Sequence, residues 1–237
     1  MYLIELVIAT GLFLGVFSSS IILGQLIGSR ISRKIGKHIG IVTGMITQVL
    51  FTTLSFILAF TILPLKILGL TLYVERGMII CWALIPSAIL VLTIIYSIIN
   101  NRWLKISARE SYCPTSYFSI VGLITLLLVA PFGEELLYRG LVEGYLILTG
   151  APMVIAVFFP AILFALTHII PFRRMFRGNM LWLMILEVFT TGTLLGFQRW
   201  MTGSLLPSVL GHSFANLGGM ISYNLLHPRG RQASPNA

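Results

Sequence analysis

Apolar runs of about 20 residues recur along the whole of this 237-residue chain, and a helix of that length crosses the ~30 Å hydrocarbon core of a bilayer. Only 10% of the residues are charged, whereas soluble domains carry about 25%. The sequence therefore predicts an all-α membrane protein, a polytopic bundle of about seven transmembrane helices. The expected spans are 3–28, 39–63, 77–99, 117–149, 152–170, 180–200 and 205–226.

The connections between these spans alternate between basic and non-basic segments. Twelve of the 16 Lys and Arg residues follow the first, third and fifth spans or lie in the C-terminal tail. Because cytoplasmic loops carry the positive excess, we expect an integral multi-pass protein with its N-terminus outside and its C-terminus in the cytoplasm. The formal net charge of +9 then reflects topology and contact with membrane lipid, and no nucleic-acid partner is expected.

The fourth expected span, 117–149, is longer than a membrane crossing requires. At ~1.5 Å per residue its 33 residues extend about 50 Å, and Pro131 is a natural break. In one interpretation residues 117–131 form an eighth, interfacial helix, and the crossing runs from about 130 to 149. In the other, both parts cross the membrane and everything downstream is inverted. The distribution of basic residues favours the first interpretation.

A short uncharged turn next to Ala151 joins this span to the next, which predicts an antiparallel hairpin. Glu134 lies 17 residues before Ala151, and His168 lies 17 residues after it. If both helices are regular, the two side chains lie side by side, roughly 25 Å from the outer turn. We expect this depth to be in the cytoplasmic third of the membrane.

The two adjacent glutamates of this span are expected to differ in role. Glu135 and Arg139 are four residues apart, so they share a helix face and can form an ion pair. Glu134 is about 100° around the helix from Glu135 and faces elsewhere. The ion pair alone could serve only to make a polar helix tolerable in lipid.

Two further pairs have the same spacing, Phe164 with His168 and His212 with Asn216. Taken singly, each histidine is better explained by a hydrogen bond to a neighbouring helix than by catalysis. Ionisable groups that converge within a membrane are, however, typical of a functional site. A carboxylate beside an imidazole suits activation of water, and a second imidazole with an amide donor suits an oxyanion. The constellation indicates hydrolysis of an acyl bond.

Three short motifs therefore follow one another along consecutive predicted helices. They are EExxxR at Glu134, Glu135 and Arg139, FxxxH at Phe164 and His168, and HxxxN at His212 and Asn216. In this order they resemble the CAAX prenyl endopeptidase and bacteriocin-processing family of intramembrane proteases, CPBP or Abi. The resemblance covers about residues 117–226. It divides the chain into N-terminal membrane helices with basic loops (1–116), a catalytic membrane core (117–226) and a short basic tail (227–237).

The resemblance implies a role for each motif residue. Glu134 would be the general base that activates water together with His168. His212 and Asn216 would form the oxyanion site. The remaining motif residues would support the site, and these are Glu135, Arg139 and Phe164. The resemblance also implies a cavity that opens toward the cytoplasm.

Members of this family are often described as metalloproteases, so a divalent metal such as zinc is one option. Glu134, His168 and His212 could supply three ligands with water as the fourth. No HExxH motif is present, and we place a metal-free glutamate mechanism ahead. The two cysteines, Cys81 in an apolar run and Cys113 in a polar loop, predict neither a disulfide framework nor a cysteine zinc site.

The resemblance implies an endopeptidase whose substrate is a peptide or a lipidated peptide, including CAAX-type C-terminal processing. The alternative is a catalytically silent family member that acts as a membrane immunity or scaffold protein. A transporter is more remote, because no repeated half is evident and the first three spans hold almost no polar groups.

Overall fold

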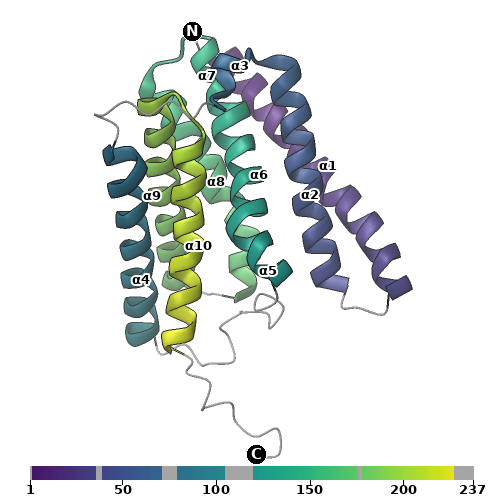
Figure 1. The fold of residues 1–237 in the computed structure, drawn as a ribbon, viewed down its shortest axis with the longest axis vertical. Helices are drawn as coiled ribbons and strands as arrows, with labels where there is room; N and C mark the ends of the chain where they lie inside the picture. The colour runs from purple at the N-terminus through teal and green to yellow at the C-terminus, as the bar shows by residue number, and fades with distance from the viewer. Residues whose placement is uncertain (1, 36–38, 71–78, 105–119, 176–177, 227–237) are drawn as a thin grey trace, which may run out of the picture.

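The protein is a helical bundle in the computed structural model, which describes residues 2–35, 39–70, 79–104, 120–175 and 178–226. Within these ranges every regular element is a helix, so the predicted all-α fold class is confirmed. Figure 1 shows the long helices running side by side along the longest axis. They are α1 (Leu3–Ile35), α2 (Ile39–Ile62), α4 (Ile85–Leu104), α8 (Met153–Met175), α9 (Asn179–Thr202) and α10 (Leu206–Leu226), with the short α3 (Leu65–Leu68) after α2.

Among the described residues, five helices are long and apolar enough to cross a membrane by length and composition. These segments are Leu3–Lys34, Thr43–Ile62, Ile80–Ile99, Met153–Ile170 and Leu181–Thr202. Large apolar side chains cover their outer faces; Leu3 is 74% exposed, Val154 66% and Trp182 65%. An outer surface of this kind is stable against lipid and unfavourable in water. The helices therefore indicate an integral membrane protein.

The segment that corresponds to the expected fourth span is one continuous helical run over residues 120–148. It consists of α5 (Ile120–Ile124), the π-helical η4 (Thr125–Val129), α6 (Ala130–Glu135), the π-helical η5 (Leu136–Glu143) and α7 (Gly144–Leu148). Pro131 does not divide it, so a separate interfacial helix is not seen over the described part; residues 117–119 lie outside that part. Crossing of the membrane by this run and by α10 stays a prediction.

The direction of the helices bears on the predicted topology. Figure 1 shows α1 (purple) and α10 (yellow) both ending at the lower end of the bundle. Arg30, Arg33 and Lys34 near the end of α1 therefore lie at the same end of the bundle as the last residues of α10. This arrangement is the one that the charge-based topology requires. The basic residues at 105–109 and the tail 227–237 lie outside the described residues, and the membrane face remains a prediction.

The N-terminal helices share one apolar core with the continuous run and α8. Phe13 of α1, Phe51 of α2, Leu136 and Leu137 of η5 and Leu163 of α8 are all buried in this core. Side chains from 1–116 thus pack directly on the helix that carries the paired glutamates.

α2 approaches this helix closely at Gly133. A Cβ at this position would lie 3.2 Å from the Cβ of Thr52 and closer still to the Thr52 hydroxyl. Because glycine has no Cβ, it lets the two helix backbones approach more closely than any other residue would. Gly133 therefore fixes α2 beside the residue that follows it, Glu134.

We expect Gly133→Ala to lower the thermal unfolding midpoint, because overpacking of this kind costs about 1–3 kcal/mol. Adding Thr52→Ala should restore part of the loss by removing the hydroxyl that the new methyl group meets. Gly11→Ala in α1 is the matched control, since a Cβ there meets nothing within 4 Å. Equal midpoints for the Gly133 and Gly11 variants would contradict the close approach.

Candidate active site

Glu135 and Arg139 form a fully buried ion pair. The Nη1 atom of Arg139 donates to Oε1 of Glu135 at 2.9 Å, and both side chains are 0% exposed. Nη2 of Arg139 donates to the carbonyl oxygen of Gly192 in α9 at 2.6 Å. The predicted i,i+4 pair is therefore confirmed, and it also ties α9 to the helix of the glutamates. Buried charges require partners of this kind.

His212 of α10 completes this buried cluster. Its Nδ1 atom lies 2.8 Å from the same Oε1 atom of Glu135. A carboxylate in an ion pair only accepts hydrogen bonds, so Nδ1 is the donor. The tautomer that this bond selects leaves the Nε2 atom of His212 without a proton when the ring is neutral.

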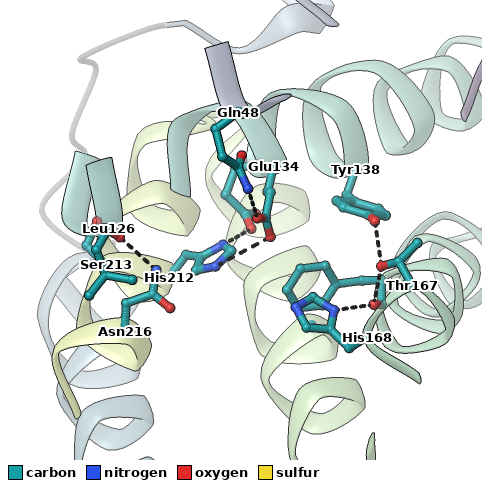
Figure 2. A network of polar contacts seen from close by, with 12 residues as sticks. Gln48, Leu126, Glu134, Tyr138, Thr167, His168, His212, Ser213 and Asn216 are labelled. Carbon is teal, nitrogen blue, oxygen red and sulfur yellow. Dashed lines mark hydrogen bonds and ion pairs between the residues drawn. The ribbon is translucent and has the colours of Figure 1, made fainter. Parts of the chain in front are cut away.

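Glu134 lies on the other side of this imidazole. Its Oε2 atom is 3.8 Å from Nε2 of His212, and its side chain is 17% exposed, against 0% for Glu135. The two glutamates thus contact the two nitrogens of one histidine. The expected difference between them is seen in their surroundings: Glu135 is buried and paired, whereas Glu134 is partly accessible. Figure 2 shows Glu134 and His212 facing each other across this short distance.

A fourth polar side chain reaches the site from α2. The Nε2 atom of Gln48 donates to Oε1 of Glu134 at 3.4 Å, and Figure 2 shows the amide directed at that carboxylate. Sequence reasoning missed Gln48, because the first three spans were taken as almost free of polar groups. The sequence nevertheless distinguishes Gln48. All other residues of the expected span 39–63 are apolar, Gly, Ser or Thr.

His168 of α8 lies apart from this group, beside Thr167 and Tyr138 (Figure 2). Its Nδ1 atom donates to the carbonyl oxygen of Phe164 at 2.8 Å, since a carbonyl can only accept. The imidazole is within electrostatic range of Glu134 and His212, but none of the hydrogen bonds or ion pairs given for the described residues joins it to Glu134.

The predicted hairpin is present, yet the equal residue count does not bring Glu134 into contact with His168. The turn is built around Gly150 at φ 74°, and the amide of Ala151 donates to the carbonyl oxygen of Leu146 at 2.9 Å. The count assumed regular helices, whereas η5 between Glu134 and the turn is π-helical. A π-helix advances less per residue than an α-helix, so residue number no longer measures depth.

Phe164 is the contact between the two histidines. Its ring centroid lies 4.7 Å from that of His168 and 5.5 Å from that of His212, with both rings edge-on. The guanidinium carbon of Arg139 lies 5.0 Å from the same centroid, a cation–π distance. The motif phenylalanine therefore contacts both imidazoles and the guanidinium group.

Asn216 and Ser213 attach α10 to the helix of the glutamates. Pro131 has no N–H group, so one carbonyl of the preceding turn lacks the intrahelical donor that another residue at this position would supply. Nδ2 of Asn216 donates to the carbonyl oxygen of Leu126 at 2.8 Å, and Oγ of Ser213 donates to that of Leu127 at 2.7 Å. The amide of Asn216 keeps a second hydrogen for another acceptor.

The side chains do not converge as a three-ligand metal site. Among the described residues, no group of three His, Cys, Asp or Glu is placed to hold an ion. Nδ1 of His212 is bonded to Glu135. The His168 ring packs edge-on against the Phe164 ring, with centroids 4.7 Å apart, and its Nδ1 atom donates to the carbonyl oxygen of Phe164. The expected set of Glu134, His168 and His212 does not fit a zinc ion in this arrangement, and the mechanism below is derived without one.

Comparison with protein-family models decides which proteins this site is similar to. The model described as type II CAAX prenyl endopeptidase Rce1-like matches residues 116–218. Over this segment, which is less than half of the chain, the protein is similar to that family. The match agrees with the resemblance carried by the three motifs, all of which lie within it. Comparisons with curated proteins and with solved structures gave no significant match.

The Rce1-like match concerns a family of proteases, so it supports a CAAX-type intramembrane protease in general. The Rce1-like segment begins after the N-terminal helices, and α2 with Gln48 lies outside it. The contact between Gln48 and Glu134 therefore joins a residue outside the matched segment to one inside it.

Proposed function

We propose that the protein is an intramembrane endopeptidase that hydrolyses a peptide bond near the cytoplasmic face of the membrane. Its substrate is a peptide or a lipidated peptide, of which a prenylated CAAX-type C-terminus is the first to test. The observation that carries this proposal is the chain of contacts from buried Glu135 through His212 to the partly exposed Glu134.

In this proposal Glu134 is the general base. A water molecule held between Oε2 of Glu134 and Nε2 of His212 fits their separation of 3.8 Å, which is too long for a direct hydrogen bond. Glu134 takes one proton from this water as its oxygen attacks the carbonyl carbon of the peptide bond. The same carboxyl group then gives the proton to the leaving amine, so the products are a carboxyl terminus and a free amine and Glu134 returns to its starting state.

Glu135 supports this chemistry through His212. A buried carboxylate that accepts from Nδ1 fixes the ring orientation and stabilises positive charge on it. The developing oxyanion requires donors that are already in position. The candidate donors to the oxyanion are the second amide hydrogen of Asn216 and an N–H group of a protonated imidazole. His168, which contacts the same Phe164 ring as His212, supplies the second imidazole.

The proposed cytoplasmic location of the site rests on the distribution of Lys and Arg along the sequence. The basic residues near the end of α1 are among those that the structure describes. A prenylated tail partitions into lipid, so it reaches a site within the membrane by lateral diffusion. The exposed apolar faces of the helices suit a protein that meets its substrate in this way.

The proposal is tested with purified protein in proteoliposomes on internally quenched peptides that end in a CAAX-type sequence. Each peptide is supplied with and without a prenyl group on its cysteine. We expect cleavage at one bond, with a higher kcat/KM for the prenylated form. The absence of turnover on every peptide would overturn the proposal and leave the non-catalytic immunity or scaffold role.

A further inference from the structure

We propose that Gln48 is a positioning residue of this active site, so that the catalytic unit includes α2. The inference rests on the proposed function, because it assigns Gln48 a task toward the base Glu134. Gln48 lies 86 positions before Glu134 in the chain and outside the Rce1-like segment.

The position of Gln48 is fixed by the packing around it. One turn further along α2, Thr52 donates to the carbonyl oxygen of Gln48 at 2.9 Å and packs on Gly133. Phe51, also on α2, is buried and lies edge-on to Phe17 of α1, with ring centroids 6.2 Å apart. The Gln48 amide is thus held on a rigid element next to the carboxylate, which is where a positioning residue is effective.

The two oxygens of Glu134 then have different surroundings. Oε1 accepts from Gln48, whereas Oε2 faces Nε2 of His212. The bond to Oε1 limits rotation of the carboxylate and keeps Oε2 directed at the place proposed for the water. Loss of such positioning lowers the rate of the chemical step more than it lowers binding.

An amide is suited to this task because it carries no net charge. Arginine or lysine at the same place would also hold the carboxylate, but a cation next to a base makes it a weaker proton acceptor. Glutamine orients the Glu134 carboxylate without adding a positive charge that would weaken it as a base. The carbonyl Oε1 of Gln48 is buried and makes no hydrogen bond within the described part of the chain. A buried polar atom without a partner lowers stability, and the orientation of Glu134 would explain why an amide is kept at this position.

The test compares Gln48→Leu and Gln48→Met with the wild type. A hydrogen bond to a carboxylate is stronger than one between neutral groups, but the 3.4 Å length makes this one weak for its kind. We therefore expect kcat to fall about 10-fold in both variants, with KM within about twofold. Gln25→Leu on the exposed face of α1 is the matched control. Unchanged kcat in both Gln48 variants, or failure of both to fold, would overturn the inference.

A second measurement separates this inference from the proposed function. Thermal unfolding midpoints are compared for Gln48→Leu, Glu134→Gln and the double variant. We expect the two changes to be non-additive, because the residues are in contact. If the wild type cleaves no peptide, the proposed function fails, whereas non-additivity still supports the contact. If the wild type cleaves but the changes are additive and kcat is unaffected, only the role of Gln48 fails.

Discussion

Glu134→Gln is expected to lower kcat on a cleaved peptide by about 10³-fold or more, within the range that general acid–base catalysis contributes. Glutamine has nearly the same shape as glutamate and can still accept a hydrogen bond from Gln48, but it cannot take a proton from water. KM should stay close to that of the wild type, since the change removes an interaction needed in the transition state. The measurement is single-peptide kinetics in proteoliposomes, with the thermal unfolding midpoint as a check on folding.

Glu187→Gln is the matched control for this substitution. Glu187 lies in α9 and interacts with Thr93 of α4, so it belongs to the packing of these two helices and not to the cluster around His212. The control should retain turnover close to that of the wild type. Retention of more than a tenth of the activity by Glu134→Gln would rule out Glu134 as the base. His212 would then be examined as the proton acceptor.

The largest loss of stability is expected from Arg139→Met. Removal of the guanidinium leaves the buried Glu135 carboxylate without its cation, and breaking a buried pair in this way costs about 3–5 kcal/mol. The hydrogen bond to Gly192 and the contact with the Phe164 ring are lost as well. The free energy of unfolding in mixed micelles, measured by denaturant titration, should show the loss directly.

The double variant Glu135→Gln with Arg139→Met tests the cause. It removes both charges, so its stability should lie above that of Arg139→Met alone, even though one more group has changed. Arg33→Met, at an exposed position of α1, is the matched control and should change stability by less than about 0.5 kcal/mol. A double variant less stable than the single one would show that packing, not charge, dominates.

The positions of the helices could be predicted because the bilayer sets the length of an apolar run. The expected spans 152–170 and 205–226 correspond to α8 (Met153–Met175) and α10 (Leu206–Leu226). The end of the first span was less accurate: 3–28 was expected, whereas α1 continues to Ile35. Arg and Lys interrupt an apolar run but are good helix formers, so hydropathy marks the edge of the membrane rather than the end of the helix.

The contacts of the candidate site were predictable only where they are local. The Glu135–Arg139 pair follows from helix geometry within one turn and was predicted. The partner of Glu134 depends on how three helices pack and on the π-helical stretch before the turn, which no spacing rule anticipates. Gln48 was missed for a related reason, because the motifs directed attention to the last four spans and the residue lies in the second.

Pro131 has a consequence that extends beyond its own helix. Because it lacks a hydrogen atom on nitrogen, one carbonyl of the preceding turn has no backbone donor, and Asn216 and Ser213 of α10 donate to carbonyl oxygens of that turn, at Leu126 and Leu127. One residue thereby sets the register of a second helix and, through it, the position of His212. In related sequences, a residue that restores the amide hydrogen at 131 is expected to occur with an apolar side chain at 213, whereas Asn216 keeps a second reason to be retained, its proposed role toward the oxyanion.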